Sequence, residues 1–308
     1  MKIFEDTNTI AITRGTAVAL GHFDGVHKGH VKLIAQMTAY AAKHGLASCV
    51  FTFSNSPKNF MRGKTVVKSI LTQTEKRELI RGLGVDYLVS VPFDETFHEM
   101  TPRAFIDDLA LGAMRAKAIG CGFNFRFGKN AKGDTGTLER AATAEGFVLN
   151  VLPPVKINGV LVSSTMIREL IQAGDVGLCV NYLGRRFALS GAVIHGEANG
   201  RKLGFPTANV VPPEGMVLPA DGVYATLVSI GKEQEARPAV TNIGVRPTFG
   251  GKVRLSETHV LDFDGNLYGK TIRVEFVKRL RGEVKFDSFD QLSAQIASDS
   301  RNAKRVLR

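Results

Sequence analysis

TAVALGHFDGVHKGHVKLIAQMTAYAAKHGLASCVFTF, residues 16–53, indicates a strand, a turn, a helix and a second strand in direct succession. The two ends, 16–20 and 47–53, are short apolar runs of the kind found in strands buried on both faces. Between them, four apolar residues share one helical face: Leu33, Ile34, Met37 and Ala41. The stretch is therefore a βαβ unit, and its two strands are expected to be parallel.

Further apolar runs follow at 87–91, 116–120 and 147–152, with helical patterns between them. This alternation predicts a parallel, doubly wound α/β sheet of the Rossmann-like type. Such sheets bind their ligands beyond the carboxyl ends of the strands. The Gly/Asp/His-rich turn after Leu20 is expected at that edge.

The pattern changes after Gly174, where short β-branched runs separated by turn signals replace the alternation. The runs are 188–194, 223–230, 239–243, 258–263 and 271–277. They predict a small antiparallel β-barrel. An amphipathic segment over 288–307 is expected to cover one side of the barrel as a C-terminal helix.

The length of 308 residues suits two domains of about 150 residues each. Because the pattern changes near 181–186, we predict domains 1–183 and 184–308.

No stretch has the apolar core of a signal peptide or a membrane span, which favours the cytoplasm. The three cysteines are widely spaced in apolar stretches, so we expect them reduced and buried. The net charge of +11 favours anionic partners: nucleic acid, a membrane surface or nucleotide phosphates.

The turn GHFDGVHKGH, residues 21–30, joins a predicted strand to the N-terminus of a predicted helix. Its glycines allow the backbone to approach a ligand closely, and helix N-termini bind phosphates. His27 and His30 can both donate to one triphosphate. A solvated turn with incidental histidines is the alternative, which the strand–glycine–helix context disfavours. The candidate nucleotide-binding residues of the turn are Gly21, Phe23, Gly25 and Gly29.

Two other segments of the first half carry candidate site residues. SSTMIR, residues 163–168, opens a predicted helix with three hydroxyls, although one would suffice as a cap. Phosphate binding is therefore expected of Ser164, Thr165 and Arg168. GFNFRFG, residues 122–128, offers Asn124 as a polar group among aromatic rings, and core packing explains the phenylalanines equally well.

In the second half, HGEANGRKLGFPTAN, residues 195–209, is a glycine- and base-rich loop that can fold over phosphates. It lacks the Walker spacing, so a long β-connection is the alternative. Thr207 and Asn209, two apart on an extended segment, project to one side, where their oxygens can bind magnesium carried by a nucleotide. The candidate nucleotide-binding residues of this loop are Gly196, Arg201, Lys202 and Gly204.

Glu257 enters the strand that is predicted to end at 263. A carboxylate at the mouth of a barrel is a candidate general base for a hydroxyl. A single glutamate is more often a solvated surface residue, and sequence order leaves both possibilities open.

GHFDGVHKGH, GFNFRFG and SSTMIR together resemble the adenylyltransferase module of prokaryotic bifunctional riboflavin kinase/FAD synthetases, within the nucleotidyltransferase superfamily. The resemblance implies in-line attack of the FMN phosphate on the α-phosphorus of ATP, with magnesium, and departure of pyrophosphate. It implies that His27 and His30 stabilise charge on the phosphates. The other residues implied to position the nucleotide or hold pyrophosphate are Asn124, Ser164, Thr165 and Arg168.

GRKLGFPTAN, DGVYA, NIGVRPTFGG, ETHVLDF and LYGK follow one another between residues 200 and 270 and resemble the riboflavin kinase module of the same family. The resemblance implies that Thr207 and Asn209 bind the magnesium of ATP. It also implies that Glu257 takes the proton from the ribityl 5′-hydroxyl as this attacks the γ-phosphate. Together the two modules predict an enzyme that phosphorylates riboflavin to FMN and adenylylates FMN to FAD.

One segment departs from the family pattern. After the second strand the family carries TF-acid-Pro-His-Pro, whereas residues 52–57 are TFSNSP. One alternative is therefore a riboflavin kinase with an impaired adenylyltransferase site. A flavin- or RNA-binding regulator is the alternative from another class, although the basic residues are spread over both halves. We expect ATP, riboflavin and FMN as substrates, and neither nucleic acid nor a membrane as partner.

Overall fold

The computed structural model describes residues 1–195, 204–231, 233, 235–248 and 251–308. These residues fall into two compact units, Met1–Ser164 and Thr165–Arg308. The predicted domain boundary between residues 183 and 184 rests on a change of sequence pattern, which is a different criterion from compactness, and it stays a prediction.

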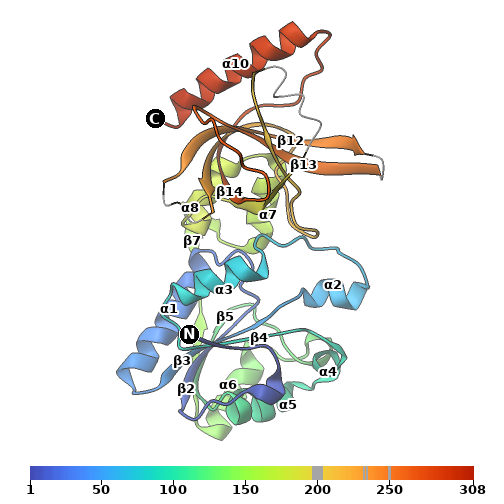
Figure 1. The fold of residues 1–308 in the computed structure, drawn as a ribbon. Coiled ribbons are helices and arrows are strands. Elements are labelled where there is room, and N and C mark those ends of the chain that lie inside the picture. Colours follow the sequence, from blue (N-terminus) through green and yellow to red (C-terminus); the bar gives the residue numbers. More distant parts are fainter. Residues whose placement is uncertain (196–203, 232, 234, 249–250) are drawn as a thin grey trace. The chain divides into compact units, whose positions relative to one another are not determined.

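The first unit is built on a parallel sheet of six strands in the order β1-β4-β3-β2-β5-β6 (Figure 1). Its strands are β1 (Lys2–Phe4), β2 (Thr16–Leu20), β3 (Ala47–Phe53), β4 (Tyr87–Val91), β5 (Ala116–Gly122) and β6 (Val148–Leu152). The predicted parallel α/β sheet is confirmed, and β2 and β3 begin and end at the predicted residues. The edge strand β1 was missed because three residues are too short to display a period.

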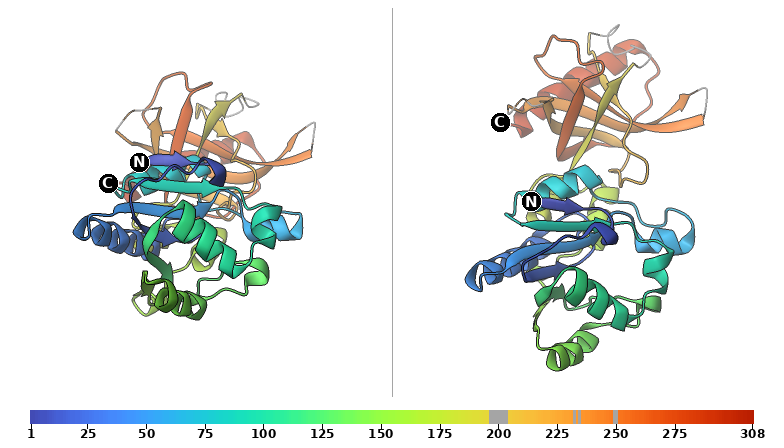
Figure 2. Two further views of the ribbon diagram at one scale, coloured as in Figure 1. Left: turned by 90° about the horizontal axis from the view of Figure 1, so that it is seen from below. Right: turned by 60° about the horizontal axis from the view of Figure 1, so that its bottom comes forward.

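Helices cover both faces of this sheet. They are α1 (Lys28–Lys43), α2 (Pro57–Arg62), α3 (Gln73–Arg81), α4 (Glu95–Glu99), α5 (Pro102–Ala104), the π-helical η2 (Phe105–Ala113) and α6 (Thr135–Glu145). The short 3-10 turns η1 (Thr7–Thr9) and η3 (Lys129–Ala131) and the hairpin β7 (Lys156–Ile157) to β8 (Val160–Leu161) complete the unit. In the right-hand panel of Figure 2, the cyan α3 and the green α6 lie on opposite faces of the sheet.

The apolar run of β2 serves two cores at once. Ala17 and Ala19 pack with Leu33, Ile34 and Met37 of α1 on one face. Val18 and Leu20 pack on the other face with apolar residues of η2 and α6. Because both faces are covered, β2 is apolar throughout and shows no alternation.

The position of β2 in the sheet decides where a ligand can bind. The chain passes from β2 through α1 to β3 on one side, and β5 is added on the other side of β2. The strand order therefore reverses at β2, and doubly wound sheets bind ligands at such a reversal, beyond the carboxyl ends of the strands. The turn that follows Leu20 lies at this point.

The second unit is a closed antiparallel barrel of six strands in the order β10-β13-β12-β11-β14-β9. Its strands are β9 (Ala188–Ile194), β10 (Ala208–Val210), β11 (Gly222–Ile230), β12 (Arg237–Thr248), β13 (Gly251–Val260) and β14 (Thr271–Arg281). The predicted barrel is confirmed. The strand predicted over 258–263 is wrong at both ends: β13 begins at Gly251, and it cannot reach 263 because Asp262 has a φ of 53°, which an extended strand does not include.

The remaining elements of this unit are α7 (Ser164–Ala173), η4 (Val176–Leu178), α8 (Cys179–Leu183) and α10 (Phe289–Val306). Helix α7 begins at the last residue of the first unit. As predicted, α10 covers the barrel, where Ala303 and Val306 pack against Val223, Val240 and their neighbours (Figure 1).

All three cysteines are free and buried, as predicted: Cys49, Cys121 and Cys179. Burial raises the pKa of each thiol. Their packing in apolar surroundings therefore keeps them in the unreactive thiol form. Among the described residues, no helix has both the length and the apolar character needed to cross a bilayer.

Candidate active sites

The turn after β2 has a backbone conformation that few sequences allow. Phe23, Gly25 and Val26 have φ values of 50°, 83° and 38°. The Phe23 ring is fully buried and folds back over Gly21, where an added Cβ would lie 2.9 Å from it. Gly21 thus permits the close packing of Phe23, whose complete burial gives its side chain a role in the core rather than at a ligand.

His27 and His30 meet at the N-terminus of α1. The Nδ1 atom of His27 accepts a hydrogen bond from the His30 backbone N–H at 3.2 Å, and the two rings stack with centroids 3.5 Å apart. Burial, with smaller effects of the charges on His27, His22 and Lys76, holds the pKa of His30 well below its ordinary value. His30 is therefore neutral, and its buried Nδ1 has no hydrogen-bond partner among the described residues. A helix N-terminus with an unpaired ring nitrogen fits an anionic ligand.

The first residue of α7 lies against this turn. The Ser164 hydroxyl donates a hydrogen bond to the backbone carbonyl of Asp24 at 2.7 Å. The buried carboxylate of Asp24 accepts the backbone N–H of Ile70 at 2.9 Å. The structure thus places Ser164, the last residue of the first unit, against the glycine-rich turn. Thr165 is exposed and Arg168 is half-buried on α7, and their roles stay predictions.

Asn124 is exposed in the turn that follows β5. Of the phenylalanines around it, Phe125 and Phe127 stack with centroids 5.6 Å apart and pack into the core, whereas Phe123 is exposed. Core packing therefore accounts for two of the three rings. The polar role of Asn124 stays a prediction.

The segment that departs from the family pattern is built into the fold. Asn55 exchanges two hydrogen bonds with the backbone of Phe93, at 3.0 and 2.6 Å. Ser56 caps α2 by accepting the Asn59 backbone N–H. Thr52 donates from its hydroxyl to the His22 carbonyl at 2.9 Å and so ties the end of β3 to the turn after β2.

Lys76 is a residue near this turn that sequence reasoning missed. It lies on α3, is 3% exposed, and its ammonium group donates to the Phe53 carbonyl at 2.8 Å. Burial lowers the pKa of Lys76 to about 8, although the Asp24 carboxylate opposes this effect. One sequence signal could have revealed it: Lys76 is four positions before the buried Ile80, so both lie on the inner face of α3.

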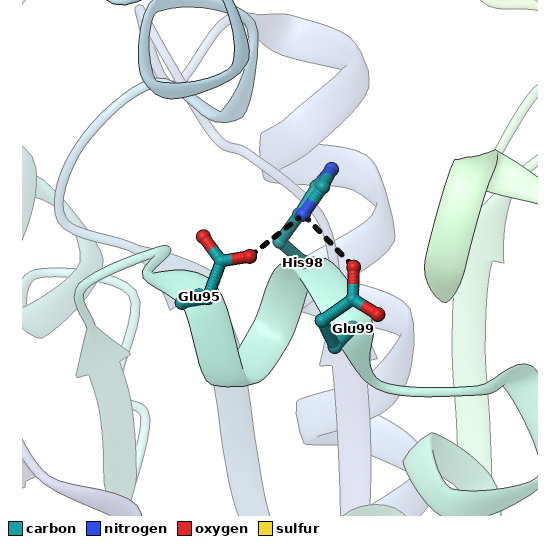
Figure 3. Close-up of side chains that lie close together, drawn as sticks. All are labelled: Glu95, His98 and Glu99. Atoms are coloured by element: carbon teal, nitrogen blue, oxygen red, sulfur yellow. Dashed lines mark ion pairs between the residues drawn. The ribbon is translucent and has the colours of Figure 1, made fainter.

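A cluster of possible metal ligands lies on the exposed surface of α4 (Figure 3). His98 Nδ1 is 3.5 Å from a Glu95 carboxylate oxygen and 3.3 Å from a Glu99 oxygen. Glu99 also forms an ion pair with Lys129. The two glutamates are exposed on one short helix and Glu99 is already paired with Lys129, and nothing else among the described residues around them points to a metal.

The barrel holds a cavity of about 270 Å³ that contains the predicted metal ligands. Thr207 and Asn209 both line it, and the loop 263–268 forms another part of its wall. The segment that leads into β10 is tied to β13, because His259 Nδ1 is 2.8 Å from the Pro206 carbonyl oxygen and the His259 ring meets Phe205 edge to face.

Glu257 is not among the residues that line this cavity, but it lies between two asparagines, one of which does line it. It is directly opposite Asn209 of β10 on one side and Asn242 of β12 on the other. Residues paired in this way on antiparallel strands share a face, with Cβ atoms about 5 Å apart. Sequence reasoning missed Asn242, although it opens the NIGVRPTFGG motif. The site thus flanks a half-buried carboxylate with two amides.

The glycine- and base-rich loop is described at its first residue, His195, whose ring stacks on that of Tyr268 with centroids 3.9 Å apart, and from Gly204 onward. Gly204 is exposed with a φ of 81°. The other candidate nucleotide-binding residues of this loop lie outside the described residues: Gly196, Arg201 and Lys202.

Comparison with known proteins identifies both units. The family model described as FAD synthetase matches residues 9–166, and the model described as riboflavin kinase matches residues 183–307. A curated bifunctional riboflavin kinase/FMN adenylyltransferase of Escherichia coli strain K12 is 37% identical over 290 residues, which cover 94% of this chain and 92% of that protein. The protein of the same name from Haemophilus influenzae is 34% identical over 297 residues, 96% of each chain.

A solved structure described as a macrolide-efflux protein from Streptococcus pneumoniae has the same fold, with a TM-score of 0.88 at 32% identity over 98% of both chains. The two matched domains make the present chain a two-domain transferase of flavin cofactor synthesis. It belongs to the family of bifunctional riboflavin kinases/FMN adenylyltransferases. The predicted family, enzyme class and bifunctional architecture are confirmed, whereas the roles of individual site residues stay predictions.

Proposed function

We propose that this chain phosphorylates riboflavin to FMN in its second unit and adenylylates FMN to FAD in its first, with ATP and magnesium in both steps. The observation that carries the proposal is that each compact unit has its own constellation of polar groups. One is the stacked histidine pair at the N-terminus of α1. The other is the row of Asn209, Glu257 and Asn242 on neighbouring barrel strands, of which Asn209 lines the cavity.

In the kinase step, Glu257 accepts the proton of the ribityl 5′-hydroxyl while the hydroxyl oxygen attacks the γ-phosphorus of ATP. The new O–P bond forms as the bond to the β–γ bridging oxygen breaks, and ADP leaves. The half-buried carboxylate beside Asn209 supports this role, because a base has to be held within hydrogen-bond reach of the substrate.

Thr207 and Asn209 would hold the magnesium ion of ATP. Their neutral oxygens are the hard donors that magnesium prefers, both face the cavity, and Asn209 is largely buried and therefore held in place. When bound, magnesium would neutralise negative charge on the phosphates.

In the adenylylation step, a phosphate oxygen of FMN attacks the α-phosphorus of ATP. The bond to the α–β bridging oxygen breaks and pyrophosphate leaves, with no protein nucleophile. His27 and His30, at the positive end of α1, stabilise the charge that develops on the phosphates. The remaining assigned residues hold pyrophosphate or position the nucleotide: Ser164, Thr165, Arg168 and Asn124.

The proposal includes a cytoplasmic location, which the three free cysteines support because thiols stay reduced there.

The deciding experiment incubates the purified chain with riboflavin and MgATP and separates the flavins over time. We expect FMN to appear first and FAD to follow with release of pyrophosphate. FMN that accumulates without FAD would leave the kinase as the single activity. Binding of RNA that survives moderate salt, without flavin turnover, would favour the regulator instead.

A further inference from the structure

The ammonium group of Lys76 is held by three acceptors beneath the turn after β2. Its Nζ lies 2.8 Å from the Phe53 carbonyl oxygen, 3.4 Å from the Thr52 hydroxyl and 3.5 Å from the His22 carbonyl oxygen. An ammonium group has three N–H donors, so these acceptors can use all of them. Lys76 is therefore not free to bind a substrate directly, and its action is on the protein around it.

These acceptors belong to two neighbouring strands of the sheet. The His22 carbonyl follows the end of β2, whereas Thr52 and Phe53 end β3. The Thr52 hydroxyl donates to the same His22 carbonyl at 2.9 Å and so closes the network. Lys76 thus joins the carboxyl ends of β2 and β3 at the base of the turn that leads to His27 and His30.

The groups that face Lys76 leave it with little compensating charge. Asp24 is the carboxylate that acts on it, and that carboxylate already accepts the Ile70 backbone N–H. Arg77 on the same helix and the imidazoles of His22, His27 and His30 supply no negative charge. Although its N–H groups have neutral acceptors, Lys76 forms no ion pair with any described residue; a buried cation without an ion-pair partner is costly, and a bound anion would lower that cost.

We propose that Lys76 is a positioning residue of the adenylylating site. It fixes the His22–His30 turn and supplies a buried positive charge, and it keeps its proton while the triphosphate is bound. This inference rests on the proposed function, in which that turn holds the phosphates of ATP. An anion close to Lys76 stabilises the protonated form. By linkage, the protonated form then binds the nucleotide more tightly than the neutral form does.

The pH dependence of the adenylylation reaction tests this coupling. FMN and MgATP are supplied, and the KM for ATP in FAD formation is measured from about pH 7.5 to about 9.5, above the ordinary histidine pKa of about 6.5. The ammonium group of free Lys76 loses its proton near pH 8. If ATP binding raises the pKa of Lys76 by about one unit, the KM for ATP should rise by about five- to tenfold over this pH range. The kcat should change less, and the KM for ATP in the kinase reaction serves as the internal control.

Three variants separate charge from packing. Lys76→Met should give a high KM in FAD formation that no longer changes with pH. Lys76→Arg, whose charge persists, should restore a low KM at alkaline pH. Lys117→Met, the same change at an exposed lysine of β5, should keep the original profile. Two outcomes would show that the charge plays no part and that the inference is wrong. In one, Lys76→Met retains the original KM and its rise at alkaline pH. In the other, both Lys76 variants lose activity but the KM still rises at alkaline pH.

A direct titration decides the question even if the variants do not fold. In the unsubstituted chain, the Lys76 side chain labelled with ¹³C at Cε should titrate at higher pH when a non-hydrolysable ATP analogue is present. An unchanged titration would overturn the inference. A chain that makes no FAD at any pH would contradict the proposed function itself, whereas normal FAD formation by Lys76→Met contradicts only the assignment of Lys76.

Discussion

Asn209 and Glu257 lie directly opposite each other on β10 and β13, so that an amide and a carboxylate share one face, and Asn209 also lines the barrel cavity. Neither residue has this neighbour along the chain. The closed barrel creates the pair, because β13 is hydrogen-bonded to β10 on one side and to β12 on the other. The kinase chemistry that we propose depends on this pairing.

Glu257→Gln should remove the kinase activity and spare adenylylation. Glutamine keeps the size and can accept hydrogen bonds from neighbouring groups, but it cannot accept the proton of the ribityl hydroxyl. We expect the kcat for FMN formation to fall by about 10²- to 10⁴-fold. The rate of FAD formation from supplied FMN, measured on the same preparation, should be unchanged. A variant that loses both rates equally would argue against independent sites in the two units.

Asn209→Ala should weaken the use of magnesium by the kinase. The change removes one neutral oxygen from the cavity and leaves Thr207 in place. We expect the magnesium concentration for half-maximal FMN formation to rise by at least about tenfold, and excess magnesium to restore part of the rate. Removal of magnesium with a chelator should stop both reactions. An unchanged magnesium requirement would show that Asn209 is not a ligand.

His27 has two roles that two substitutions can separate. Its ring caps α1 and stacks on His30. His27→Ala should cost about 1 kcal/mol of stability through loss of the cap, whereas His27→Asn keeps an acceptor and should restore most of it. Both variants should make FAD about 10²- to 10³-fold more slowly, because neither carries the imidazole. Full activity in His27→Asn would show that His27 acts only as a helix cap.

Lys76 should make the stability of the first unit depend on pH. Its pKa is about 8 in the folded chain and about 10.4 when unfolded, so the unfolded chain binds more protons between these values. The free energy of unfolding should therefore rise with pH from about 8 to about 10.4, by at most about 3 kcal/mol. Denaturant unfolding of the original chain and of Lys76→Met, compared across this window, measures the difference. Identical pH dependences in the two proteins would show that Lys76 does not titrate there.

Much of the fold follows from local patterns. The limits of β2 and β3 and the inner face of α1 were predicted correctly, because burial on two faces or on one stripe leaves a period in the sequence. The antiparallel barrel was predicted from its spaced β-branched runs for the same reason. The short strand β1 was missed, since three residues cannot show a period, and β10 was predicted as an extended segment but not as a strand of the barrel.

Part of the candidate site was also visible in the sequence. His27, His30, Ser164, Thr207 and Asn209 stand in motifs rich in glycine or hydroxyl groups, which are informative because few structural roles require such clusters. For Glu257, sequence order left a base and a surface residue both open, and only the resemblance to the kinase module implied its role. Phe23 shows the limit of this reasoning: it lies within such a motif, yet its ring is buried in the core. A motif locates a turn, but it does not say which side chains of the turn face a ligand.

The sequence by itself determined the two-domain architecture and the segments that carry the chemistry, because periodicity and motif spacing are properties of neighbouring residues. The enzyme family followed from the resemblance of those motifs to known ones. Only the tertiary structure decided which distant residues meet. The parallel sheet brings the ends of β2 and β3 together over Lys76, and the barrel sets Asn209 and Asn242 on either side of Glu257. Such contacts depend on strand order and register, which many weak interactions along the whole chain establish together.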